Sequence, residues 1–146
     1  MQKGKVIALD FGTKRIGIAT GDFETRIAFP TKVVRNSSEV LDEITLFTNE
    51  MDAKLIVVGL PLDMRDSEVD SAMLVVVRKF VSRLRNNLAK HNLKGVEVNF
   101  FDERLTTHEA KTLIQATDFS HKNKKMEKDA ISAQIILQRF FDSEKN

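Results

Sequence analysis

The sequence contains no cysteine, tryptophan or tyrosine, and only two prolines. Without cysteine, disulfide bonds, zinc thiolate sites and cysteine nucleophiles are excluded. No run of about 18 apolar residues is present, which excludes a membrane-spanning helix. The apolar run Val6–Leu9 is broken by Asp10 and is too short for the hydrophobic region of a signal peptide. These absences predict a cytoplasmic protein with no membrane partner.

The residues that are present are typical of one folded domain. The chain has 146 residues, of which 42% are hydrophobic and 30% charged, with ten phenylalanines to fill the core. We therefore expect a single domain over residues 1–146. The net charge of +2 is too small to indicate a nucleic-acid partner by itself, so only the distribution of basic residues can do so.

The first third of the chain predicts three strands. Val6–Leu9 is a continuous apolar run, as expected of a central strand buried on both faces. Arg15–Ala19 begins a second strand that pairs with the first as a hairpin. A third strand is expected over Ile27–Val34, at an edge of the sheet because Pro30 cannot donate a hydrogen bond.

The rest of the chain alternates helices with strands. We expect a helix capped by Ser37 or Ser38, a long second helix, a third capped by Thr106 or Thr107, and a last helix after a lysine-rich loop. Residues 55–58 and 96–101 are the two intervening strands. The first helical stripe is Val40, Ile44, Phe47 and Met51, and the second is Val69, Met73, Val76, Phe80, Leu84 and Leu88. This order predicts an α/β fold with a mixed sheet.

Carboxylates follow two of the buried strands, where ligands of α/β sheets bind. Asp10 closes the first strand, and Asp102 and Glu103 close the last. A carboxylate after four buried apolar residues is costly unless it is solvated, paired or bound to a cation. The alternative for Asp10 is a turn before Gly12. Alternation leaves open which of Asp102 and Glu103 turns inward, and the other could pair with Arg104.

Asp129 is a further carboxylate of interest. It precedes Ala133, Ile136 and Phe140 by four, seven and eleven residues, so it shares their helical stripe and would face the sheet. The equally supported alternative is a helix N-cap.

Converging carboxylates would require a cation. Two unit charges about 4 Å apart repel by about 4 kcal/mol at an effective dielectric near 20. Oxygen ligands without cysteine, in a chain with three scattered histidines, select hard ions. We therefore expect Mg²⁺ or Mn²⁺, which activates water and stabilises the leaving oxygen in phosphodiester cleavage.

Basic residues gather next to these carboxylates and are our candidates for contacts with a phosphate backbone. The alternative is a solvated loop before Asp129. Without interleaved aromatic residues, base stacking is not expected. The candidates are Lys14, Arg15, Arg104, Lys122, Lys124, Lys125 and Lys128.

Four segments resemble the YqgF/RuvX family, relatives of the RuvC Holliday junction resolvases. The opening segment is Asp10–Gly17 (DFGTKRIG), and the second is Gly59–Leu62 (GLPL). The third is Asp102–Ala110 (DERLTTHEA). The fourth comprises Lys125, Lys128, Asp129, Ala130, Ser132 and Ala133, followed by Ile136, Leu137 and Gln138. They occur in the family's order over nearly the whole chain.

The resemblance implies an RNase H-like fold, with a five-stranded mixed sheet whose first three strands are antiparallel. It also implies a divalent-metal nuclease with Asp10, Glu103 and Asp129 as catalytic and metal-binding carboxylates, and Asp102 as a substitute or neighbouring ligand. Family members are linked to 5′-end maturation of pre-16S ribosomal RNA and to Holliday junction resolution. The implied partners are pre-rRNA or branched DNA, and ribosomal precursor particles, for a monomer or homodimer. Where RuvC-type resolvases have a glutamate after the fourth strand, this chain has Gly59-Leu60-Pro61, which favours RNA processing over junction resolution.

Two other classes of protein are consistent with parts of the sequence. Actin-like and sugar-kinase ATPases also carry an Asp-x-Gly-Thr loop after a strand, but they need two such domains. A non-catalytic nucleic-acid-binding factor would keep the basic surface and be indifferent to loss of Asp10, Glu103 and Asp129.

Overall fold

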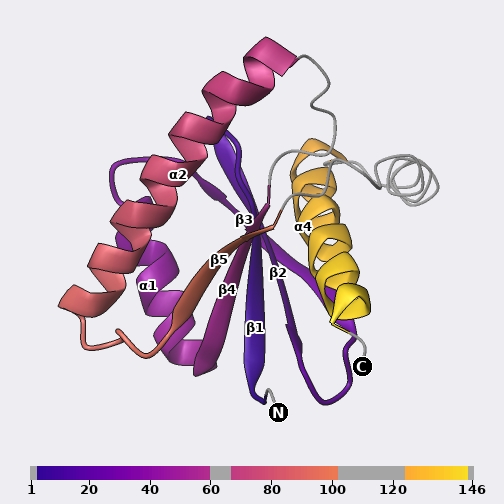
Figure 1. The fold of residues 1–146 in the computed structure, drawn as a ribbon. Helices are drawn as coiled ribbons and strands as arrows, with labels where there is room; N and C mark the ends of the chain where they lie inside the picture. Colours follow the sequence, from indigo (N-terminus) through magenta and orange to yellow (C-terminus); the bar gives the residue numbers. More distant parts are fainter. Residues whose placement is uncertain (1–2, 60–66, 102–123, 145–146) are drawn as a thin grey trace.

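The computed structural model describes residues 3–59, 67–101 and 124–144, and its centre is a five-stranded sheet (Figure 1). The strands lie in the order β3-β2-β1-β4-β5. Their bounds are Lys5–Asp10 for β1, Arg15–Asp22 for β2, Ala28–Arg35 for β3, Ala53–Gly59 for β4 and Glu97–Phe101 for β5.

The sheet is mixed. Strand β2 pairs antiparallel with β1 and with β3, whereas β4 pairs parallel with β1 and with β5. The predicted five-stranded sheet with three antiparallel strands first is therefore confirmed. Strand β1 is central, as expected, because Val6–Leu9 is buried on both faces.

Strand β3 lies at the edge that Pro30 predicts. Pro30 is opposite Ala19, and the register with β2 shifts between Ile18 and Ala19. The edge position is compatible with proline because one side of this strand needs no donor for a neighbouring strand.

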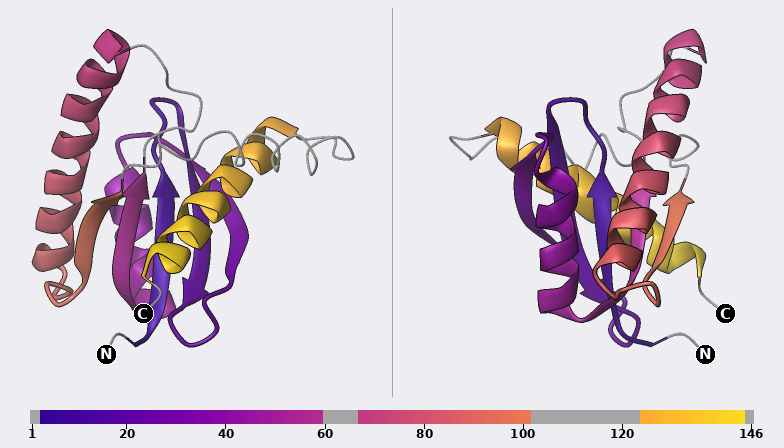
Figure 2. Two further views of the ribbon diagram at one scale, coloured as in Figure 1. Left: turned by 45° about the vertical axis from the view of Figure 1, so that its right-hand side comes forward. Right: turned by 90° about the vertical axis from the view of Figure 1, so that its left-hand side faces the viewer.

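Helices cover the two faces of the sheet separately (Figures 1 and 2). Helices α1 (Val40–Met51) and α2 (Ser67–Lys90) lie on one face, and α4 (Lys124–Ser143) lies on the other. Each face has its own hydrophobic core. The α4 core contains four phenylalanines whose rings contact one another: Phe23, Phe101, Phe140 and Phe141.

Three local predictions are wrong. Helix α1 has Glu39 as its N-cap, without a side-chain hydrogen bond, in place of Ser37 or Ser38. The Ser37 hydroxyl instead accepts a hydrogen bond from the Glu39 amide. In α2, Val76 is 43% exposed and Val77 is buried, so the stripe there is displaced by one residue.

The third correction concerns the lysine-rich loop that we expected up to Lys128. Helix α4 already begins at Lys124, so Lys124, Lys125 and Lys128 belong to the helix. The predicted helix after Thr106 or Thr107 and the start of that loop lie outside the described residues. Within the described segments, no helix combines the length and apolar character needed to cross a membrane.

Candidate active site at the carboxyl end of β1

Asp10 is the last residue of β1 and is only 8% exposed. Alternation along the strand places it on the same face as Val6 and Ala8, which belong to the α4 core. Its neighbours in the sheet are Gly17 of β2 and Gly59 of β4. A buried carboxylate thus lies at the centre of the sheet's ligand-binding end, beneath the face that α4 covers.

Helix α4 approaches the sheet closely at both glycines that flank Asp10. A Cβ atom on Gly17 would lie 2.0 Å from the backbone oxygen of Asp129, and one on Gly59 would lie 2.7 Å from Cδ1 of Ile136. Only glycine permits contacts of this kind. Directly opposite residues of an antiparallel pair have Cα atoms about 5 Å apart. The backbone of Asp129 therefore lies against the immediate cross-strand neighbour of Asp10.

Asp129 is held by an ion pair with the first residue of β2. Arg15 Nε donates a hydrogen bond to Asp129 Oδ2 at 2.8 Å, and the two side chains are 30% and 28% exposed. Asp129 is the sixth residue of α4, counted from Lys124. The prediction that it shares the inward helical stripe is correct, and the N-cap alternative is wrong.

The turn after Asp10 is fixed at both ends. The Phe11 amide donates to the carbonyl of Gly59 at 3.2 Å, and the Phe11 ring packs on Phe80 with centroids 4.9 Å apart. Asn36, which follows β3, holds the other end: its side-chain Nδ2 donates to the Gly12 carbonyl at 2.8 Å, and its amide donates to the Lys14 carbonyl at 2.9 Å.

Sequence reasoning missed Asn36 and the nearby Arg35. Asn36 makes its contacts with a segment more than twenty residues earlier in the chain, so no local motif identifies it. Arg35 faces Arg15 across the β2–β3 ladder. The only signal for both was their position at the end of a predicted strand.

The predicted basic residues have different surroundings. Lys14 is exposed beside the turn, Arg15 pairs with Asp129, and Lys128 is exposed one residue before Asp129. Lys124 and Lys125 lie in the first turn of α4, and their side chains are outside the described part. Arg104 and Lys122 also lie outside the described residues.

Two of the predicted carboxylates are brought to one face of the sheet, namely Asp10 and Asp129. Asp102 and Glu103 lie outside the described residues. Within the part of the chain that the structure describes, no three Asp, Glu, His or Cys side chains form a group that could hold a metal ion. The donor set nevertheless fits a hard cation, because a carboxylate as buried as Asp10 favours a positive partner and both residues offer only oxygen.

Comparison with solved structures assigns the fold. The chain is similar to Thermus thermophilus RuvC, both alone and in complex with Holliday junction substrate. The TM-scores are 0.53 and 0.56, both at 11% sequence identity, and each comparison covers 95% of this chain. The protein therefore has the RNase H-like fold of the RuvC nucleases, as the resemblance predicted.

The sequence defines the family more narrowly. The model of the family described as "RuvX: Holliday junction resolvase" matches residues 4–143, and the chain belongs to this family. A relative from Endomicrobium trichonymphae is 36% identical over 94% of this chain and 95% of its own length. Another, from Caldanaerobacter subterraneus, is 37% identical over 97% of this chain and 99% of its own length. Both relatives carry the name "Putative pre-16S rRNA nuclease".

Proposed function

We propose that this protein is a divalent-metal-dependent endonuclease that hydrolyses phosphodiester bonds in structured nucleic acid, with the 5′ region of pre-16S rRNA as its substrate. The observation that carries the proposal is the buried Asp10 at the carboxyl end of β1, on the sheet face against which α4 presents Asp129. The family and the names of the relatives support the same chemistry.

Asp10 and Asp129 would hold the cation, together with a carboxylate from the segment after β5. The chemistry that Mg²⁺ or Mn²⁺ supplies when bound is activation of water and stabilisation of the leaving oxygen. Asp10 would be held rigidly, because its strand is hydrogen-bonded on both sides. Arg15 orients the Asp129 carboxylate through their ion pair.

We propose Glu103 as the third carboxylate, with Asp102 as a neighbouring ligand. Phe101, the last residue of β5, packs on Phe140 of α4 with ring centroids 6.0 Å apart. Val98 instead belongs to the core on the opposite face. Because side chains alternate along a strand, the position two residues after Phe101 shares its α4-facing parity, and that position is Glu103. Glu103→Gln should then reduce cleavage more than Asp102→Asn.

The test is a cleavage assay with a pre-16S rRNA precursor and a four-way DNA junction, each in Mg²⁺, in Mn²⁺ and with the metal chelated. We expect metal-dependent cleavage of the rRNA precursor by the wild type and none by Asp10→Asn. Asp52→Asn is the matched control, because Asp52 is exposed and precedes β4 at the opposite end of the sheet. Full activity of Asp10→Asn would refute the proposed site.

Holliday junction resolution is the second candidate, favoured by the family description and by the RuvC complex. It predicts symmetric paired nicks in the DNA junction by a homodimer. Cleavage of the junction without cleavage of the precursor would replace our first proposal with this one. Binding of both nucleic acids without cleavage, unchanged by Asp10→Asn, would identify a non-catalytic binding factor.

A further inference from the structure

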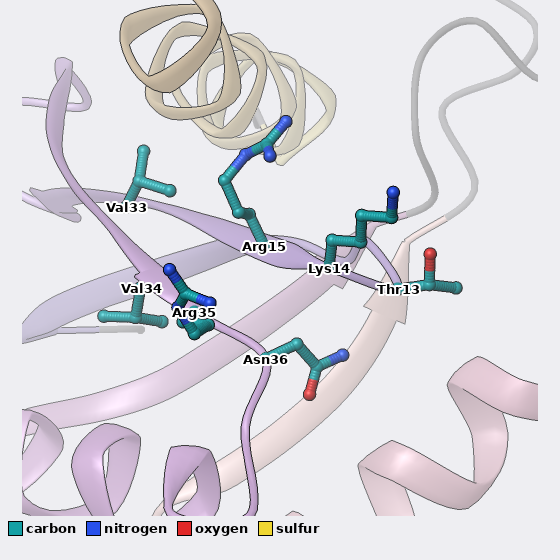
Figure 3. A pocket seen from close by; sticks show the side chains of 7 residues that line it. All are labelled: Thr13, Lys14, Arg15, Val33, Val34, Arg35 and Asn36. Carbon is teal, nitrogen blue, oxygen red and sulfur yellow. The ribbon is translucent and has the colours of Figure 1, made fainter.

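A basic pocket lies between the start of β2 and the end of β3, beside the candidate active site (Figure 3). Its volume is about 450 Å³. Three of the residues that line it are cations, namely Lys14, Arg15 and Arg35, and its described lining contains no carboxylate. Val33 and Val34 supply an apolar wall. A concave surface with this lining is suited to an anion that also carries apolar groups.

The positive charge of this pocket is only partly compensated. Arg15 and Arg35 are directly opposite each other in the β2–β3 ladder, an arrangement that is unfavourable for like charges. The Arg15 side chain is directed toward α4 (Figure 3), where it pairs with Asp129. Among the described residues, neither Lys14 nor Arg35 has a carboxylate within 4.0 Å. Two cations therefore remain available to an anionic ligand.

The pocket wall is held in place before any ligand binds. Asn36 lines the pocket and donates hydrogen bonds to the carbonyls of Gly12 and Lys14, which fixes the turn relative to the end of β3. Backbone contacts position Lys14, Arg15 and Arg35 independently of substrate. Such preorganisation lowers the entropic cost of binding.

The location relates the pocket to the candidate active site. Arg35 ends β3 and Asp10 ends β1, at the same end of the sheet, with β2 between them. Neighbouring strands are about 4.8 Å apart, so the two positions are separated by about 10 Å across the sheet. Successive nucleotides of a duplex strand advance by about 3.4 Å along the helix axis. A strand that passes Asp10 therefore reaches the pocket after about three nucleotides.

We propose that this pocket binds a backbone phosphate of the substrate, about three nucleotides from the bond cleaved at Asp10. Lys14 and Arg35 bind the phosphate oxygens, and Val33 and Val34 face the sugar. The inference rests on the proposed function for the identity of the ligand as a nucleic acid. The subsite lies outside the carboxylate site and positions the strand without taking part in the reaction.

The first measurement is the salt dependence of binding to the rRNA precursor and the DNA junction, made in the Asp10→Asn background so that no cleavage occurs. Lys14→Ala/Arg35→Ala should lower the slope of log K against log salt by about 0.9 for the one phosphate lost. The matched control is Lys5→Ala/Lys54→Ala, which removes two exposed lysines from the opposite end of the sheet. This control should leave the slope unchanged. Equal slopes for the two double variants would overturn the proposal.

The second measurement locates the phosphate. Single neutral methylphosphonate linkages are introduced one at a time along a synthetic DNA junction strand. The Asp10→Asn protein should lose affinity when the linkage occupies one flanking position, and the same protein with Lys14→Ala/Arg35→Ala should be insensitive there. Sensitivity that is identical in both proteins at every position would contradict the subsite.

These readouts separate the subsite from the nuclease proposal, since neither requires cleavage. If wild-type protein cleaves its substrate but the pocket variants bind as the control does, the subsite is wrong and the nuclease proposal stands. If the position-specific effect is found and wild-type protein cleaves nothing in either metal, the nuclease proposal is wrong and the phosphate site stands.

Discussion

Arg15 and Asp129, which are 114 residues apart in the sequence, form an ion pair with 2.8 Å between Nε and Oδ2. The pair joins the start of β2 to α4, directly above the glycine that is paired with Asp10. Arg15 also lines the basic pocket. One side chain therefore connects a candidate metal-binding carboxylate with the surface proposed to bind the substrate backbone.

The first prediction concerns the strength of this ion pair. A double-mutant cycle of Arg15→Gln and Asp129→Asn should give a coupling free energy of about 1 kcal/mol or less at low salt, because both side chains are partly exposed. The coupling should fall in about 1 M salt, where the screening length is about 3 Å. Urea denaturation of the four proteins measures it. Zero coupling at low salt would show that the pair contributes nothing to stability.

The second prediction concerns the contact of α4 with the sheet. Gly17→Ala should lower the free energy of unfolding by about 3 kcal/mol or more, because its Cβ would meet backbone atoms of Asp129 that cannot rotate away. Gly95→Ala is the control, since a Cβ there would meet no atom within 4 Å. Chemical denaturation compares the two variants. Equal stability of both would mean that α4 does not approach β2 as closely as described.

The third prediction concerns the hold of Asn36 on the turn. Asn36→Ala removes the hydrogen bond to the Gly12 carbonyl and should cost about 1 kcal/mol. It should also speed hydrogen exchange at the Asn36 amide, which donates to Lys14. Asn86→Ala, at an exposed position of α2, should change stability by only a few tenths of a kcal/mol. Unchanged exchange in Asn36→Ala would argue against a clamp by this side chain.

The fourth prediction tests metal binding without measuring activity. Mg²⁺ or Mn²⁺ at about 100 times its dissociation constant should raise the free energy of unfolding of the wild type by about 2.7 kcal/mol. Asp10→Asn should lose this increase, whereas Asp52→Asn should keep it. Thermal or urea unfolding with and without the metal gives the comparison. An equal increase in the wild type and in Asp10→Asn would place any bound metal elsewhere.

Much of the fold follows from local patterns. Four consecutive apolar residues before Asp10 are sufficient to predict the central strand, and Pro30 is sufficient to place β3 at an edge. The patterns were less exact where two structures satisfy them equally. In α2, both Val76 and Val77 are apolar, and only packing against the sheet buries the second.

The sequence by itself determined the class of fold, the family and the placement of Asp10 at a strand end, because these depend on periodicity and on short motifs. Only the tertiary structure decided that Asp129 is an inward helical residue, since α4 begins five residues before it. It also brought Arg15 to Asp129 and Asn36 to the turn after Asp10. Such contacts join segments distant in the chain, and their geometry is set by the close packing of a helix on glycines, which no local pattern encodes.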